Sequence, residues 1–195
     1  DPSIATVTAA YKTGTSEPKL QEVTSIENGK QYLIVNQRQD ALLTNTSDSS
    51  WRKDYSGLKL DGTASPQSTA LWTITSSNGS YTARYSDGYY LKIGKNSTST
   101  TSSSANLTLS YSATSGYGNH VGYWNISQDG YYLNNLGNTT CAGGYKEDNN
   151  PSVAATDDGS KWTLYEIVTE DQMGTTFTFT GSKVGTTTVM INSVE

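Results

Sequence analysis

Asn78-Gly79-Ser80-Tyr81-Thr82-Ala83-Arg84-Tyr85 is the stretch that decides the fold. Its Asn-Gly turn leads into a run typical of a β-strand entered through a tight hairpin. A similar turn followed by Tyr starts at Asn28 and at Asp129, so the three starts lie 50 and 51 residues apart. Three copies of one unit indicate pseudo-threefold symmetry.

A second pattern follows each start. Trp-x-Ile or Trp-x-Leu occurs in the strand candidates beginning at Trp72, Trp124 and Trp162. Recurrence of a large aromatic residue at one position of a repeat is what core packing requires. We therefore predict that these Trp side chains are core residues, and we predict the same of Tyr32, Tyr81 and Tyr132.

Each unit divides into four strand candidates, in which one side chain in two can face inward. The candidates are residues 31–36, 41–45, 57–61 and 70–75, then 80–85, 89–93, 106–110 and 122–127, then 131–135, 140–145, 152–156 and 161–167. The polar run Ser97–Ser104 is expected to be an exposed loop. Twelve strands in three units predict an all-β protein with a β-trefoil fold, a closed barrel capped by three hairpins.

Composition excludes several function classes. A net charge of −5 and only 16% charged residues argue against nucleic-acid binding, which needs clustered Lys and Arg. No run of about 18 apolar residues is present, so we expect no membrane insertion. No phosphate loop or zinc spacing occurs, and the acidic Glu147–Asn150 matches no known calcium loop, so no cofactor or metal site is predicted.

The strands that carry the recurrent Trp resemble the Gln-x-Trp strand of ricin-type β-trefoil lectins and carbohydrate-binding modules. The position two residues before Trp holds Ala70, Gly122 or Ser160, so this chain lacks the Gln of that motif. The resemblance spans about residues 20–168. It implies a β-trefoil fold and sugar binding, while the missing Gln removes the usual template for the sugar contacts.

The flanks resemble a different family. Asp1–Val7 (DPSIATV) and Thr178–Ile191 (TFTGSKVGTTTVMI) are similar to strands of bacterial group 2 immunoglobulin-like domains. The expected organisation is therefore an immunoglobulin-like strand in residues 1–19, a β-trefoil in residues 20–168, and an immunoglobulin-like strand pair in residues 169–195. The trefoil would be inserted in a loop of such a domain; two extended tails that pair with each other or with the barrel are the alternative.

Catalysis has little support in the sequence. The single imidazole, His120, has no nucleophile or carboxylate in a readable register. The acid pairs Glu147-Asp148 and Asp157-Asp158 are interpreted as solvated turns, because two catalytic carboxylates need a cleft and a defined separation. We therefore predict no catalytic residue.

Sugar binding is better motivated, because a shallow carbohydrate site needs an aromatic ring for the apolar sugar face and polar side chains for the hydroxyls. The chain has 14 Tyr and 4 Trp beside abundant Asn. Trp51 lies outside the recurrent Trp position, in a polar loop, although packing against the barrel end is an alternative for it. The resemblance adds one group of candidates per unit. The predicted ligand-binding residues are Trp51, Arg52, Tyr55, Asp40, Asn45, Asp87, Tyr89, Asn96, Asn138, Tyr145 and Asn149.

The expected function is non-catalytic glycan binding by a monomeric module of a larger, secreted or surface-anchored bacterial protein. Its partners would be mucin or polysaccharide glycans. The alternative is a structural or protein-binding adhesion module, with a host protein as partner and without sugar affinity. A hydrolase is the third hypothesis.

Overall fold

The computed structural model describes residues 5–9, 12–15, 19–44, 52–54, 70–136, 142–146, 151–168, 171–173 and 177–181. The chain divides into two compact units. One consists of the two flanks, residues 1–16 and 169–195, and the other of residues 17–168.

Strands of the two flanks pair with one another. β1 (Ala5–Ala9) is antiparallel to β17 (Phe177–Gly181), and β2 (Lys12–Thr15) is antiparallel to β16 (Asp171–Met173). Both an inserted trefoil and a pair of extended tails allow this pairing. The immunoglobulin-like nature of the flanks, and with it the expected domain assignment, stays a prediction.

The larger unit is built from three lobes of four strands each. Lobe 1 has β4 (Gln31–Asn36), β5 (Ala41–Leu43), β6 (Arg52–Asp54) and β7 (Trp72–Ser77). Lobe 2 has β8 (Ser80–Tyr85), β9 (Tyr90–Gly94), β10 (Ser97–Thr101) and β11 (Thr108–Ser112). Lobe 3 has β12 (Tyr123–Gln128), β13 (Tyr131–Asn134), β14 (Gly143–Tyr145) and β15 (Trp162–Val168).

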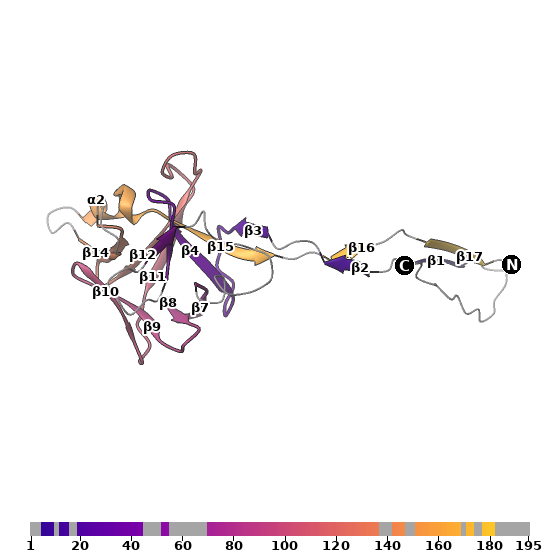
Figure 1. Ribbon diagram of the computed structural model, residues 1–195, viewed down its shortest axis with the longest axis horizontal. Coiled ribbons are helices and arrows are strands. Elements are labelled where there is room, and N and C mark those ends of the chain that lie inside the picture. The colour runs from indigo at the N-terminus through magenta and orange to yellow at the C-terminus, as the bar shows by residue number, and fades with distance from the viewer. Residues whose placement is uncertain are drawn as a thin grey trace. The chain divides into compact units, whose positions relative to one another are not determined.

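The first and fourth strands of the lobes form a closed circle of antiparallel pairings (Figure 1). Within the lobes, Tyr32 pairs with Trp72, Tyr81 with Leu107, and Trp124 with Trp162. Between lobes, β7 pairs with β8, β11 with β12, and β15 with β4. The second and third strands of each lobe form a hairpin. This is a β-trefoil, and the predicted all-β fold class is confirmed.

Three further elements of the larger unit lie in the described residues. β3 (Lys19–Glu22) extends the sheet along β15. A short helix, α2 (Pro151–Thr156), and a 3₁₀ turn, η2 (Asp158–Ser160), connect β14 to β15. No helix in the described ranges is long and apolar enough to cross a membrane.

The predicted assignment of strands to the repeat units is wrong in the second half of the chain. Trp124 lies in β12, the first strand of lobe 3, and Leu107 occupies the position in lobe 2 that Trp72 and Trp162 occupy in theirs. Likewise, Asp129-Gly130 joins the first and second strands of its lobe, as Asp87-Gly88 does. First and fourth strands both line the barrel, so their apolar patterns are alike and sequence alone did not separate them.

Two segments also differ in secondary structure from the prediction. Residues 97–101 form β10 rather than a loop, because their backbone pairs along β9 and Thr suits a pleated strand. Residues 151–156 form α2 rather than a strand, because Pro151 opens a helical turn and Ala154 and Ala155 favour it. The predicted strand at 57–61 lies outside the described residues.

The barrel interior contains the large aromatic side chains. Trp72 and Trp162 are fully buried and Trp124 nearly so, which confirms the predicted core role of all three. Their indole Nε1 atoms donate to the carbonyls of Leu43, Leu133 and Val23 at 3.1, 2.8 and 2.8 Å. Tyr32 is buried as predicted. Tyr81 is partly buried against the core, whereas Tyr132 is half-buried and its neighbour Tyr131 packs there instead.

Candidate functional site

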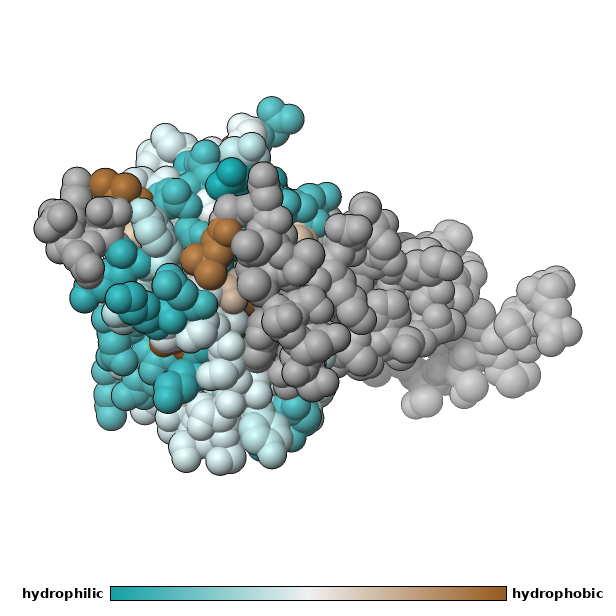
Figure 2. All heavy atoms as spheres, turned by 60° about the vertical axis from the view of Figure 1, so that its left-hand side comes forward, coloured by the Kyte–Doolittle hydropathy of each residue, from teal (hydrophilic) through white to brown (hydrophobic). Residues whose placement is uncertain are grey.

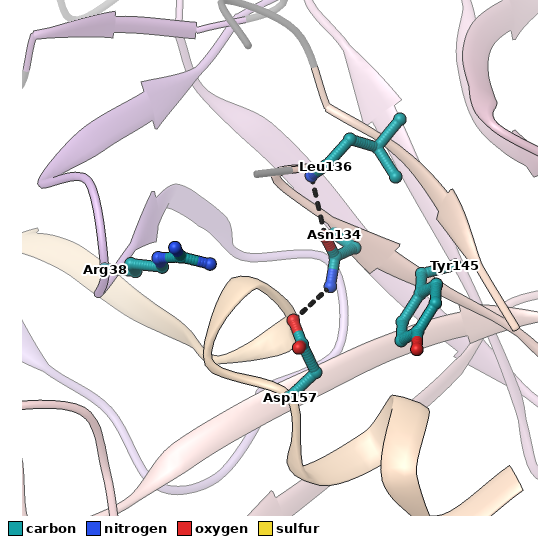
Figure 3. A pocket seen from close by; sticks show the side chains of 5 residues that line it. All are labelled: Arg38, Asn134, Leu136, Tyr145 and Asp157. Atoms are coloured by element: carbon teal, nitrogen blue, oxygen red, sulfur yellow. Dashed lines mark hydrogen bonds between the residues drawn. The ribbon is translucent and has the colours of Figure 1, made fainter. Parts of the chain in front are cut away.

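An open cavity of about 340 Å³ lies on lobe 3 (Figure 3). Asn134 stands at the end of β13, Leu136 follows that strand, and Tyr145 ends β14. Asp157 comes from the link between α2 and η2, and Arg38 comes from the turn between β4 and β5 of lobe 1. Four of the five described lining residues therefore belong to one lobe.

Asp157 is fixed by the local structure of its turn. Its amide donates to the Val153 carbonyl at 2.9 Å, which closes the last turn of α2. Its carboxylate Oδ1 accepts from the Gly159 amide at 2.8 Å, as an Asp at the start of a helical turn does. A side chain at Gly159 would meet the Asn134 amide group, since a Cβ there would lie 2.7 Å from Oδ1 of Asn134. The turn therefore places the half-buried carboxylate against Asn134.

Asn134 is buried, with 3% of its surface exposed, and its side-chain amide is fully used. Nδ2 donates to Oδ1 of Asp157 at 2.7 Å and to Oγ of Ser160 at 2.9 Å. Its Oδ1 accepts from the Leu136 amide at 2.6 Å. Asn134 is thus a positioning residue for Asp157. The second carboxylate oxygen of Asp157, Oδ2, accepts no hydrogen bond from a described residue.

Tyr145 and Arg38 lie on opposite sides of the Asn134–Asp157 pair (Figure 3). Tyr145 is half-buried and sits opposite Tyr132 in the register of β13 and β14. Close contact of the hairpin with Leu136 requires Gly143, because a Cβ there would overlap the Leu136 side chain. The cavity thus has an aromatic ring on one side and a cationic group on the other.

The turn that carries Arg38 is anchored by the two residues before it. Nε2 of the buried Gln37 donates to the Gly122 carbonyl at 2.7 Å, and its Oε1 accepts from the Tyr117 amide at 2.9 Å. Nδ2 of Asn36 donates to the Gly159 carbonyl at 2.9 Å. Buried amide groups with several partners hold the lobe 1 turn against lobe 3. No described residue accepts a hydrogen bond from the Arg38 guanidinium.

The groups that line the cavity are suited to binding a polar ligand with an apolar face. It offers an acceptor at Asp157, donors at Arg38, and the ring of Tyr145 for an apolar face. Glycoside hydrolysis uses two carboxyl groups that flank the bond, and Asp157 is the single carboxylate among the described residues that line the cavity. Within the described ranges, no group of three or more His, Cys, Asp or Glu side chains could hold a metal ion.

The predicted lobe 2 candidates do not come together. Asp87 and the exposed Tyr89 lie at one end of β9, where Oδ1 of Asp87 accepts from the Tyr89 amide at 2.9 Å. Asn96 lies in the turn at the other end, with a φ of 52°. β9 spans Tyr90–Gly94, and a strand rises about 3.3 Å per residue, so one small sugar cannot contact both ends.

Most lobe 1 and lobe 3 candidates are not described. Asp40 is an exposed turn residue with a φ of 47°, and Arg52 lies in β6. The structure places Tyr145 at the cavity, as a lobe 3 site requires. Outside the described residues lie Trp51, Tyr55, Asn45, Asn138 and Asn149. As ligand contacts, all of these residues remain predictions.

Sequence reasoning missed Arg38, Asn134, Leu136 and Asp157. The interpretation of Asp157-Asp158 as a solvated turn is wrong for Asp157, which is half-buried and bonded to Asn134 and Gly159. The Asp-x-Gly pattern of residues 157–159 could have indicated a turn that fixes its carboxylate. Nothing in the sequence places Arg38 beside lobe 3.

The other lobes lack the same set of residues at equivalent positions. Asp87-Gly88-Tyr89-Tyr90-Leu91 matches Asp129-Gly130-Tyr131-Tyr132-Leu133, and both Leu side chains are fully buried. Because Tyr90 pairs with Thr101 as Tyr132 pairs with Tyr145, lobe 2 has Lys92 and Thr101 where lobe 3 has Asn134 and Tyr145. In lobe 1, the register of β5 and β6 puts Thr44 at the position of Asn134 and Lys53 at the position of Tyr145. Only lobe 3 combines the amide with the aromatic ring.

The described surface around these sites is polar. The face in Figure 2 is mostly hydrophilic, with hydrophobic residues scattered over it. Large hydrophobic side chains that are exposed in the described ranges include Tyr89, Tyr117, Val121 and Val153. Scattered exposed apolar residues are normal on a soluble domain. The cavity, rather than an apolar face, is therefore the candidate site.

Comparisons with known proteins give two similar structures. The Macrolepiota procera ricin B-like lectin, solved with lactose, is 14% identical, with a TM-score of 0.44; the match covers 74% of this chain and 98% of the lectin. A Culex quiquefasciatus salivary protein of the cysteine and tryptophan-rich family is 16% identical, with a TM-score of 0.46, covering 73% and 96%. No protein-family model and no curated protein matches the sequence.

Proposed function

We propose that the protein is a non-catalytic glycan-binding module whose site is the lobe 3 cavity. The observation that carries this proposal is the position of the Tyr145 ring beside Asp157, a half-buried carboxylate held by Asn134. A pyranose has an apolar face that stacks on an aromatic ring and hydroxyl pairs that donate to a carboxylate. The cavity volume of about 340 Å³ suits one or two sugar rings.

The site is proposed to occur once per chain, because lobes 1 and 2 lack the combination of amide and aromatic residue. One shallow site gives weak binding, and tighter attachment would need several modules acting together. The wider setting proposed for this activity is attachment of a secreted or surface-anchored bacterial protein to host or dietary glycans. The resemblance of residues 1–7 and 178–191 to strands of bacterial immunoglobulin-like domains motivates that setting.

The test is a glycan array with mucin O-glycans and plant polysaccharides, followed by titration of the best ligand. Tyr145→Ala is expected to weaken binding about tenfold or more, because about 1.4 kcal/mol of stacking corresponds to that factor. Thr101→Ala is the matched control at the equivalent position of lobe 2 and should bind like wild type. Trp51→Ala tests the separate prediction that Trp51 contacts sugar.

Three outcomes would count against the proposal. If the wild-type protein bound no glycan of either class, the proposed activity would be contradicted. Equal losses in Tyr145→Ala and Thr101→Ala would place the site elsewhere. Capture of a defined host protein that survives enzymatic removal of its glycans would favour the protein-binding alternative.

A further inference from the structure

We infer that the glycan bound at the lobe 3 cavity carries a carboxylate group, as in sialic or uronic acids, and that Arg38 recognises it. This inference rests on the proposed glycan-binding function and adds the chemical class of the ligand. The proposed site requires only a ring and an acceptor. The additional observation is a guanidinium at the rim of the cavity.

Arg38 differs from the other cations whose side chains the structure describes. Only Arg38 and Lys161 among them are not exposed. Nζ of Lys161 pairs with Oδ1 of Asp158 at 2.9 Å and lies 5.4 Å from the ring centroid of Tyr123. Arg38 forms no ion pair with any described residue, although it is partly removed from water. A partly buried cation without an ion-pair partner is costly, and an anionic ligand would supply that partner.

The geometry of a guanidinium favours a carboxylate as that anion. Its planar fork of N–H donors matches the two oxygens of a carboxylate and forms paired, charge-assisted hydrogen bonds. The negative charge of the ligand cannot lie on the Asp157 side of the cavity, because the Asp157 carboxylate would repel it. Asp157 Oδ2 instead accepts hydroxyl groups.

These constraints require a ligand that presents three different groups, one to each of the three side chains. The carboxylate faces Arg38, hydroxyl groups face Asp157, and an apolar ring face lies against Tyr145 (Figure 3). Sialic and uronic acids combine these three features in one sugar ring. A sulfated sugar is the other source of negative charge, because two oxygens of a tetrahedral group can also bind the planar fork in a pair. The titrations below therefore include one.

The experiment compares charged and neutral forms of one glycan. A sialylated oligosaccharide, its carboxyl methyl ester and its desialylated form are titrated separately by calorimetry or NMR, alongside a glucuronide and a sulfated galactoside. The carboxylated glycans are expected to bind about tenfold or more tightly than the ester, with affinity falling as salt rises. Arg38→Gln should abolish this preference, and Arg38→Lys should restore only part of it.

A matched control separates local recognition from general charge. Arg84→Gln removes a cation from lobe 2, where Nε of Arg84 donates to the Gly88 carbonyl at 3.0 Å. This variant should keep the wild-type preference for the carboxylate. Thermal melts of all three variants establish that each is folded, so that a lost preference reports the site.

The outcomes separate this inference from the proposed function. Equal affinity for the acid and its ester in wild type would overturn the inference and leave glycan binding intact. A preference for the sulfated galactoside over every carboxylated glycan would overturn the choice of carboxylate. Binding of none of these glycans, nor of any on the array, would end both proposals.

Discussion

The hairpins β9–β10 and β13–β14 share a backbone arrangement but differ in chemistry. In each hairpin, a Tyr of the first strand pairs with the last residue of the second strand, Tyr90 with Thr101 and Tyr132 with Tyr145. The residue after the buried Leu lies two positions after that Tyr. One hairpin has the exposed Lys92 and the half-buried Thr101 at these positions, while the other places Asn134 and Tyr145 around a cavity. Threefold symmetry is therefore a property of the barrel, and the site is a local departure from it.

The largest loss of stability is expected from substitutions at the equivalent core positions of the fourth strands. Trp162→Ala is expected to lower the free energy of unfolding by about 3–5 kcal/mol, since it leaves a large cavity and removes the indole donor to the Leu133 carbonyl. Leu107→Ala at the equivalent position of lobe 2 should cost about 2–4 kcal/mol. Denaturant midpoints measured at constant slope check both values. A smaller cost for Trp162 than for Leu107 would contradict this assignment of equivalent positions.

The next comparison removes the amide that distinguishes lobe 3. Asn134→Ala is expected to cost about 1–3 kcal/mol of stability, because Asp157 and Ser160 lose a buried partner. Glycan affinity should fall with it, because the carboxylate is no longer fixed. The exposed Lys92 is the matched position, and Lys92→Ala should change stability by less than about 0.5 kcal/mol. Similar losses from both variants would show that the two hairpins do not differ as proposed.

A finer comparison concerns the turns before these hairpins. Gly88 and Gly130 have φ values of 93° and 80°, so an Ala at either position is strained by about 1–2 kcal/mol. A Cβ at Gly88 would also lie 3.0 Å from Nη2 of Arg84, whereas the nearest atom at Gly130 is Cε of Lys146 at 3.8 Å. Thermal melts should therefore rank Gly88→Ala as slightly less stable than Gly130→Ala. The reverse order would mean that Arg84 moves aside without cost.

The smallest effect is expected where lobes 1 and 3 meet. Hydrogen bonds to Glu27 and then to Glu166 raise the pKa of Lys30 above its ordinary value of 10.5. A raised folded pKa stabilises the protein below pH 10.5, and that stabilisation is lost as the pH rises through the higher folded value. Lys30→Gln should lower the melting temperature by about a degree or less at neutral pH, because the ion pairs of Lys30 with Glu27 and Glu166 are at the surface. The difference from wild type should shrink at alkaline pH and in high salt.

The candidate site was only partly predictable from the sequence. Tyr145 is predicted because the resemblance to ricin-type lectins implies a polar residue and an aromatic residue near the second hairpin of each unit. Asp157 was assigned to a solvated turn, because its partner Asn134 lies 23 residues away in the chain. Arg38 lies farther still, and reaches lobe 3 only because Asn36 and Gln37 fasten its turn there. Contacts between lobes have no signature in a local pattern.

The sequence by itself determined the all-β class, the threefold organisation and the buried positions of Trp72, Trp124 and Trp162. Turn chemistry and the spacing of large aromatic residues are local, and local patterns survive in the chain. Only the tertiary structure decided which strand each Trp occupies, that residues 97–101 form a strand, and that residues 151–156 form a helix. It also decided that Arg38 of lobe 1 lines the same cavity as Asn134, Tyr145 and Asp157 of lobe 3. Closure of the barrel sets strand neighbours over long sequence separations, and it is those neighbours that assemble the site.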